Sequence, residues 1–179
     1  QDPAESLPAL LDQVQAAGGR LMLRYNATTF PKQCAEVRTR DAWRYGRFVV
    51  QMAAPRVPGM ISSFFLYTGR SGTRSHYEID IEMVGEEATI HTNYWVAGVP
   101  REAKIALPEG LDRTRMNFYS ITWTASSIAW HVWHDNAWYP LRIAQNVRIS
   151  ARMQLMMNVW LTNPKANFGG IFAGSPLEA

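Results

Sequence analysis

Short runs of alternating residues, separated by turn residues, are the feature of this sequence that most constrains its fold. These runs are rich in β-branched and aromatic residues and are bounded by Gly, Pro, Ser, Asn or Asp, as strands that end in turns are. The connections between them suit antiparallel pairs and leave little room for crossover helices. We therefore predict an all-β fold, an antiparallel β-sandwich of the jelly-roll type. The predicted strands are residues 47–52, 61–67, 76–83, 88–95, 118–124, 128–133 and 152–160.

Residues 6–17, SLPALLDQVQAA, are the only candidate for a helix. Their apolar residues also fit a strand that leads into a Gly18-Gly19 turn and a second run at 20–25, so both interpretations stay open. There is no repeat, linker or low-complexity segment, and we expect a single domain over residues 1–179. No apolar run reaches 18 residues, and the N-terminus lacks the basic and apolar pattern of an intact signal peptide.

Composition excludes several classes of site. The net charge is +3, with arginines scattered among apolar positions, and this is too weak a signal for a nucleic-acid partner. Cys34 is the single cysteine of the chain, which excludes an internal disulfide and a zinc cluster of several thiolates. We expect it to be a half-buried free thiol. The four histidines have no ligand-like spacing, so neither a metal nor another cofactor is predicted.

The stretch SHYEIDIEM places an unusual row of acids on one predicted strand. Side chains of a strand alternate between its faces, so Glu78, Asp80 and Glu82 share one face while Ile79 and Ile81 share the other. Three like charges in a row repel one another, and a merely solvated face usually mixes its charges. The row therefore indicates chemistry, and glycoside hydrolysis is a reaction that needs two carboxyl groups side by side.

The spacing of Glu78 and Glu82 can be compared with what that reaction requires. Four residues of strand span about 13 Å, and the two side chains can lean together until their carboxyl groups lie within about 6 Å. Retaining enzymes hold these groups about 5–5.5 Å apart, and inverting enzymes about 6.5–9.5 Å. The spacing suits retention without excluding inversion. Asp80, between them, can hydrogen-bond a neighbouring carboxyl and help keep one glutamate protonated.

Motifs along most of the chain resemble those of glycoside hydrolase family 16, the bacterial lichenase and laminarinase group. The family's signature is an E-I-D-I-E strand in a β-jelly roll, and EIDIE stands here at residues 78–82. The other similar motifs follow in the family's order between about residue 34 and residue 177. They include CAEVRT at 34–39, YGRFVV at 45–50, SSFFLYTG at 62–69, NYWVAGV at 93–99, Trp123 with IAWHV at 128–132, and MMNVW at 156–160.

The resemblance implies a role for each acid and a set of substrate contacts. Glu78 would be the nucleophile, Asp80 the assisting acid and Glu82 the general acid/base of a retaining, endo-acting hydrolase. Its substrate would be a β-1,3/1,4-linked glucan or a related bacterial exopolysaccharide, and the enzyme would be secreted or periplasmic. The matching substrate-binding positions are Glu36, Arg38, Phe65, His76, Asn93, Tyr94, Trp95, Asn158 and Trp160.

Several departures from the family pattern leave questions open. His76-Tyr77 replaces the usual Trp-Asp before the acidic strand, which leaves specificity open, and Arg70 and Arg74 nearby could favour an anionic glycan. Both ends look short, so the structural calcium site of the family is not carried over. A minimal variant, a shortened chain and a partner chain that completes the sheet edges are the alternatives.

Two other functions are compatible with the same residues. A transglycosylase would use the same covalent intermediate with a sugar as the acceptor. A noncatalytic carbohydrate-binding jelly roll would need the aromatic and polar contacts but not the acid pair. Because both Glu78 and Glu82 are present, we favour hydrolysis.

Overall fold

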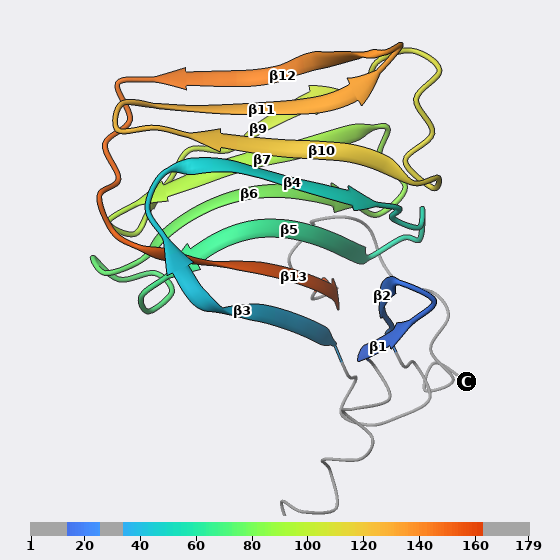
Figure 1. Cartoon of the computed structure of the whole chain (residues 1–179), viewed down its shortest axis with the longest axis horizontal. Coiled ribbons are helices and arrows are strands. Elements are labelled where there is room, and N and C mark those ends of the chain that lie inside the picture. Colours follow the sequence, from blue (N-terminus) through green and yellow to red (C-terminus); the bar gives the residue numbers. More distant parts are fainter. Residues whose placement is uncertain (1–13, 26–33, 163–179) are drawn as a thin grey trace, which may run out of the picture.

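The computed structural model describes residues 14–25 and 34–162, and all regular structure in these ranges is β-strand (Figure 1). None of the described segments is a helix with the length and hydropathy needed to cross a membrane. The strands are β1 (Val14–Ala17), β2 (Arg20–Leu23), β3 (Ala35–Trp43), β4 (Gly46–Met52), β5 (Met60–Thr68), β6 (Tyr77–Val84), β7 (Thr89–Val96), β8 (Val99–Pro100), β9 (Ala103–Ala106), β10 (Asn117–Trp123), β11 (Ser127–His134), β12 (Ala137–Gln145) and β13 (Met153–Leu161).

Two antiparallel sheets form the body of the molecule. The larger sheet has the order β3-β13-β5-β6-β7-β8, with β9 also paired to β7, and the smaller has the order β12-β11-β10-β4. Figure 1 shows the smaller sheet in front of β6, β7 and β9. This arrangement confirms the predicted all-β jelly-roll sandwich.

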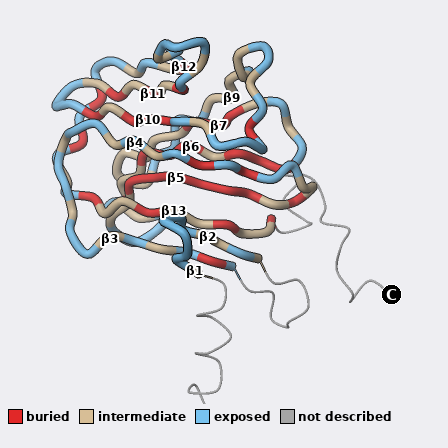
Figure 2. Tube along the Cα trace, turned by 45° about the vertical axis from the view of Figure 1, so that its right-hand side comes forward, coloured by how far each residue is buried: buried red, intermediate tan, exposed pale blue. Residues whose placement is uncertain are grey.

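The core lies between the two sheets because each presents its apolar face to the other. Ile79, Ile81 and Met83 of β6 are almost completely buried, as are Ile121 and Trp130 of the smaller sheet. Figure 2 shows buried residues running along β5 and β6. Since side chains alternate on β6, burying the isoleucines turns the three acids toward the other face of the larger sheet.

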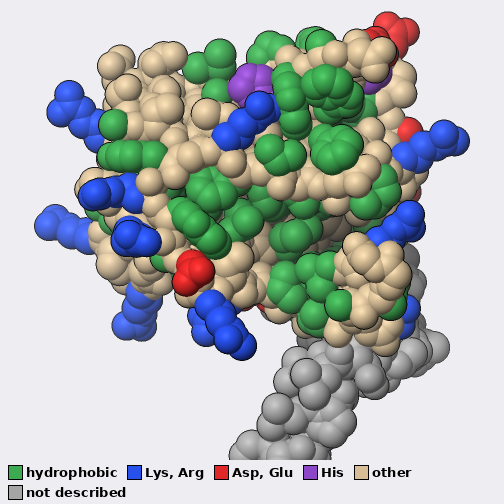
Figure 3. All heavy atoms as spheres, in the orientation of Figure 1, with side chains coloured by type: hydrophobic (Ala, Val, Ile, Leu, Met, Phe, Trp, Pro, Cys, Tyr) green, Lys and Arg blue, Asp and Glu red, His purple; other side chains and the backbone are tan. Residues whose placement is uncertain are grey.

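The outer face of the smaller sheet is exposed. It carries apolar side chains that include Val49, Phe118 and Trp133, and Figure 3 shows apolar side chains gathered over this sheet. Along β4 and β11 the outward positions alternate with more buried ones. They lie across both sheets from the acidic residues of β6.

The seven predicted strands are all present, each within one residue at both ends. Four strands of the sandwich were not predicted: β3, β8, β9 and β12. Strand β3 carries charged residues at four of its nine positions, and β12 contains Pro140, which argues against a strand. Pro140 is accommodated because the register between β11 and β12 shifts beside it, between Trp130 and His131.

The N-terminal segment is a hairpin where it is described. Strands β1 and β2 pair across Gly18 and Gly19, whose φ angles of 59° and 71° favour glycine. The strand interpretation is therefore confirmed for the C-terminal part of 6–17, and residues 6–13 lie outside the described ranges. The predictions about both chain ends also fall outside them.

The expectation for Cys34 was wrong. Its thiol is free, but the side chain is exposed and not half-buried. Cys34 comes directly before Ala35, the first residue of β3, which is itself buried. Because alternate side chains face opposite ways as the strand begins, the position next to Ala35 points to solvent.

Shortening one core side chain of β6 tests this packing. We expect Ile81→Ala, at a fully buried position between the sheets, to lower the free energy of unfolding by about 2–5 kcal/mol because it leaves a cavity. The matched control, Val49→Ala, changes a side chain that is 48% exposed on the outer face and should cost less than about 1 kcal/mol. Urea unfolding followed by tryptophan fluorescence measures both. Equal losses would contradict this description of the core.

Candidate active site

Strand β6 brings the three predicted acids together on the face of the larger sheet that is turned away from the smaller sheet. Glu78, Asp80 and Glu82 lie at alternate positions, and neighbouring strands place further polar and aromatic residues directly beside them. Opposite these acids, in order, stand Tyr67, Phe65 and Ser63 on β5, and Trp95, Asn93 and His91 on β7.

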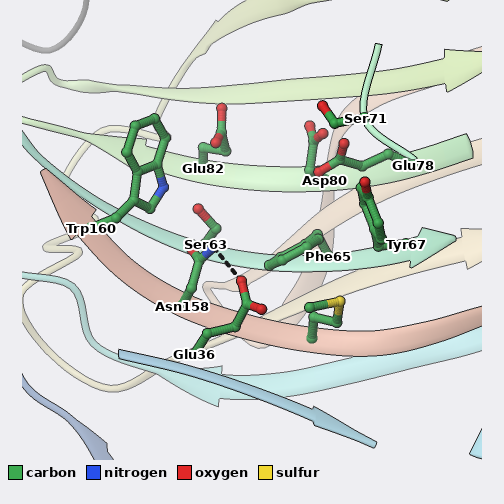
Figure 4. A pocket seen from close by; sticks show the side chains of 11 residues that line it. Glu36, Ser63, Phe65, Tyr67, Ser71, Glu78, Asp80, Glu82, Asn158 and Trp160 are labelled. Atoms are coloured by element: carbon green, nitrogen blue, oxygen red, sulfur yellow. Dashed lines mark hydrogen bonds between the residues drawn. The ribbon is translucent and has the colours of Figure 1, made fainter. Parts of the chain in front are cut away.

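The three acids line one open pocket with a volume of about 390 Å³ (Figure 4). Their side chains point into it from β6, and Trp160 stands at the same end as Glu82. The pocket is lined by Glu36, Ser63, Phe65, Tyr67, Ser71, Glu78, Asp80, Glu82, Met156, Asn158 and Trp160. A groove of this kind, with aromatic rings and convergent polar groups, suits a sugar chain.

The backbone beneath the acids is held from the core side. The indole Nε1 of Trp130 donates to the carbonyl oxygen of Asp80 over 3.0 Å. Arg142 lies 5.1 Å from the ring centre of Trp130 and 5.3 Å from that of Tyr94, and it donates to the carbonyl oxygen of Thr92. These contacts join the smaller sheet to β6 and β7 directly behind the pocket.

The location of Tyr94 differs from the sequence expectation. It pairs with Ile79, so it faces the core and not the acids, and its ring lies 6.2 Å from that of Trp130. The structure therefore does not bring Tyr94 into the candidate site. Its neighbours Asn93 and Trp95 face the acidic side, because consecutive strand residues point in opposite directions.

Burial and mutual repulsion raise the pKa of all three acids. Burial, then the charges of Glu82 and Glu36, raise the pKa of Glu78 to about 8. Asp80 is 4% exposed, and burial followed by Glu82 and Glu78 raises its pKa well above the usual range. Burial also raises the pKa of Glu82, against the opposing charge of His91. The three groups therefore cannot all ionise at once near neutral pH.

His76 contacts Glu78 and does not line the pocket. Its Nε2 lies 2.7 Å from Oε2 of Glu78, and the residue is only 1% exposed. Its ring packs between Trp95, at 4.5 Å, and Tyr67, at 5.2 Å. The resemblance placed His76 among the substrate contacts, but its burial leaves no surface for a sugar to reach.

His91 is a second buried histidine beside the acids, and sequence reasoning assigned it no role. Its Nε2 lies 2.8 Å from Glu87 Oε2, and its Nδ1 lies 3.0 Å from Glu102 Oε1. Both ring nitrogens therefore contact carboxyl groups. His91 stands opposite Glu82 in the register, and its electrostatic effect lowers the pKa of that acid against the larger effect of burial.

The other predicted contacts divide between the pocket and its surroundings. Glu36, Phe65, Asn158 and Trp160 line the pocket, and Asn158 Nδ2 donates to Glu36 Oε2 over 3.3 Å (Figure 4). Arg38 is exposed on the same face of β3, beside Met156, without lining the pocket.

Asn93 and Trp95 share the face of the acids but are engaged with the protein. The side-chain oxygen of Asn93 accepts a hydrogen bond from the backbone of Arg101 over 2.9 Å. Trp95 covers His76. Neither residue lines the pocket. Trp95 therefore reaches the acidic row through its contact with His76.

Four pocket residues were not singled out from the sequence: Ser63, Tyr67, Ser71 and Met156. Ser63 and Tyr67 lie two residues to either side of Phe65, so strict alternation along that strand could have found them. Met156 alternates with Asn158 in the same way. Ser71 lies in the loop between β5 and β6, where no sequence pattern indicates the direction of a side chain.

Comparison with known proteins gives the family. The sequence matches the profile of glycosyl hydrolases family 16 over residues 11–173. The chain belongs to this family. This confirms the resemblance found from the motifs around the acidic strand.

The relatives and the solved structures agree with that assignment. A β-glucanase of Paenibacillus macerans is 32% identical over 166 residues, which are 90% of this chain and 68% of that protein. A β-glucanase structure from Bacillus licheniformis superposes with a TM-score of 0.79 at 28% identity, covering 91% of this chain and 76% of that one. A lichenase from a mouse hindgut metagenome gives 0.78 at 27% identity, covering 92% and 78%.

The raised pKa of Glu78 predicts how stability depends on pH. Its carboxyl keeps a proton in the folded state up to a pKa of about 8, whereas the unfolded chain releases it near 4.5. The folded state therefore binds more protons in this window, and the free energy of unfolding falls as pH rises through it. We expect Glu78→Gln to flatten this fall and to raise stability at pH 8 by about 1–3 kcal/mol.

Thermal and urea unfolding between pH 4 and pH 9 measure this effect. The matched control is Glu109→Gln, which neutralises an exposed loop acid and should keep the wild-type pH dependence. A Glu78→Gln variant whose stability changes with pH as steeply as wild type would show that Glu78 is ionised in the folded state throughout this range.

Proposed function

We propose that this chain is a retaining, endo-acting β-glucanase that cleaves its glycan by double displacement on Glu78. The observation that carries the proposal is that Glu78, Asp80 and Glu82 line one open pocket together with Trp160 and other sugar-compatible side chains. Membership of a glycosyl hydrolase family and similarity to β-glucanases support the same conclusion.

In the first step Glu78 would attack the anomeric carbon. A bond forms between a carboxylate oxygen of Glu78 and that carbon, while the glycosidic C–O bond breaks and its electron pair leaves with the departing oxygen. Glu82 gives its proton to this oxygen, so the leaving sugar departs as a neutral alcohol. The product of this step is a covalent glycosyl-enzyme.

In the second step water would replace Glu78. Glu82, now a carboxylate, takes a proton from the water as its oxygen bonds to the anomeric carbon, and the bond to Glu78 breaks. Two inversions at the same carbon return its original configuration. The enzyme returns to its reactive state, with Glu78 ionised and Glu82 protonated. Because the pKa of Glu78 is raised to about 8, this state is the minor one below that pH.

The environment of each acid supports this division of roles. Asp80 is the most buried of the three, and burial raises its pKa well above the usual range, which favours its protonated form. A protonated Asp80 can donate to a neighbouring carboxylate. The His76 contact at 2.7 Å favours negative charge on Glu78 and opposes the effect of burial.

The glycan would lie along the open pocket. Trp160 offers a flat apolar face to sugar C–H groups, and Glu36 and Asn158 offer hydrogen-bond partners to hydroxyl groups. We expect a β-1,3/1,4-linked glucan or a related bacterial exopolysaccharide, met outside the cytoplasm by a secreted or periplasmic enzyme. Transfer of the glycosyl group to a sugar in place of water would use the same residues.

Replacement of the proposed nucleophile tests the reaction. Glu78→Gln should lower the rate of hydrolysis at least about 10³-fold, since a glutamine amide cannot attack the anomeric carbon. Release of reducing ends is measured on barley mixed-linkage glucan, laminarin and an acidic exopolysaccharide. Glu109→Gln serves as the control and should retain wild-type rates. Equal, near-zero rates for wild type and Glu78→Gln on every glycan would favour the noncatalytic binding function.

Truncation of the aromatic platform tests where the sugar binds. Trp160→Ala should raise KM about 10-fold and lower kcat by less than about 5-fold, because it removes stacking that ground state and transition state share. Trp133→Ala removes an indole from the outer face of the smaller sheet and is the matched control. If both variants keep the wild-type KM, the glycan does not run past Trp160.

A further inference from the structure

His76 has a position that substrate binding does not explain. It is buried, its ring lies beneath Trp95 and Tyr67, and one nitrogen contacts Glu78. We propose that His76 is a positioning residue that holds Glu78 for attack by donating its Nε2–H, in a tautomer fixed by the backbone amide of Gly72. This inference rests on the proposed role of Glu78 as nucleophile.

The tautomer follows from the partners of the two ring nitrogens. The backbone N–H of Gly72 donates to Nδ1 of His76 over 3.3 Å. An amide nitrogen can only donate, so Nδ1 must offer a lone pair and cannot carry a proton. The proton of the neutral ring is then on Nε2, which faces the carboxylate of Glu78 at 2.7 Å.

The ring cannot easily turn away from this arrangement. Trp95 packs on it with the two ring planes 31° apart, and Tyr67 packs on it at 48°. Both residues stand beside Glu78 in the register, one on each neighbouring strand. The direction of the Nε2–H bond is therefore set by packing from β5 and β7 as well as by Gly72.

The loop of residues 69–75, between β5 and β6, holds the Gly72 amide in place. Thr73 is its anchor, because its hydroxyl donates to the carbonyl oxygen of Arg70 over 2.7 Å and contacts Ser75 Oγ at 2.8 Å. Its own carbonyl oxygen accepts the backbone N–H of His76 over 3.0 Å. These contacts tie the loop to Ser75 and His76, which directly precede β6.

Two glycines allow this loop to pack closely. Gly69 has a φ of 87°, and a Cβ there would lie 1.8 Å from the carbonyl oxygen of Ser75. Gly98, at the turn between β7 and β8, has a φ of 82°, and a Cβ there would lie 2.5 Å from the carbonyl oxygen of Thr73. The Gly98 amide also donates to the carbonyl oxygen of His76 over 3.0 Å. The loop is thus fixed against β7 from outside the pocket.

The hydrogen bond has a direct consequence for the nucleophile. His76 engages Oε2 of Glu78, which orients the carboxylate and leaves Oε1 for the anomeric carbon. It also stabilises the ionised form that attack requires, in a place where burial and two other acids favour the neutral form. His76 therefore acts through Glu78 without touching the substrate.

Two variants separate positioning from a merely structural role. His76→Phe keeps a ring between Trp95 and Tyr67 but removes the donor, and His76→Gln keeps an N–H that can reach Glu78. We expect kcat of His76→Phe to fall roughly 10- to 100-fold, the size of a lost hydrogen bond to a charged group, with KM changed less than about 3-fold. His76→Gln should restore most of the rate.

An activated substrate identifies which carboxyl is affected. On an oligosaccharide with a dinitrophenyl leaving group, which departs without a proton, Glu82→Gln should form the covalent intermediate at close to the wild-type rate. His76→Phe should remain slow on this substrate, because attack by Glu78 is impaired. Rapid-quench measurement of dinitrophenolate release gives the rate of this step for each variant.

The tautomer is measured without reference to activity. A long-range ¹H–¹⁵N spectrum of the histidine-labelled wild-type protein should show His76 with its proton on Nε2. A proton on Nδ1 overturns the inference, and so does His76→Phe with wild-type rates on both substrates; in either case the proposed function stands if wild type is active. A wild type that is inactive on every glycan overturns the proposed function, and the positioning role with it.

Discussion

The burial of the isoleucine face of β6 is the constraint on which the rest of the site depends. Three acids on one side of a strand repel one another, and nothing about them favours a folded arrangement. The opposite side offsets this cost, because Ile79, Ile81 and Met83 are almost completely buried and each contributes about 1.5–3 kcal/mol. Alternation then leaves the acids no other direction to face.

Two buried histidines make the acids unequal. His76 contacts Glu78, and His91, held between Glu87 and Glu102, stands opposite Glu82. Chemically identical carboxyl groups therefore lie in different environments. Such differences allow each carboxyl group to take a separate catalytic role. The same crowding raises the pKa of Glu78 to about 8, so the arrangement that suits catalysis also lowers stability as the pH rises.

Sequence alternation predicted the sandwich and the acidic face because both depend on a period of two residues. It could also have corrected one expectation drawn from the resemblance. In the run Asn93, Tyr94, Trp95 the middle residue must face away from its neighbours, and it packs against Trp130 in the core. The resemblance gave a set of positions without saying which way their side chains point. On a strand that direction follows from the alternation of residues along the sequence.

The environment of His76 could not be predicted in this way. Alternation places His76 on the same face as Glu78, which follows it by two residues. This position agrees with a substrate contact as well as with the observed hydrogen bond. What decides between the two is burial by Trp95 and Tyr67, which come from different strands and meet only when the register is formed. The Gly72 amide lies in a loop, where no periodicity exists to indicate its direction.

The loop of residues 69–75 joins substrate contact to the nucleophile. Ser71 of this loop lines the pocket, and the amide of the next residue, Gly72, donates to His76. Under the proposed function, a glycan that contacts Ser71 would also contact the segment that fixes the histidine tautomer. Thr73 and the close approaches of Gly69 and Gly98 hold this loop in place, so a substrate would have to fit the loop as it stands. Selectivity and the orientation of Glu78 would then depend on the same short segment of backbone.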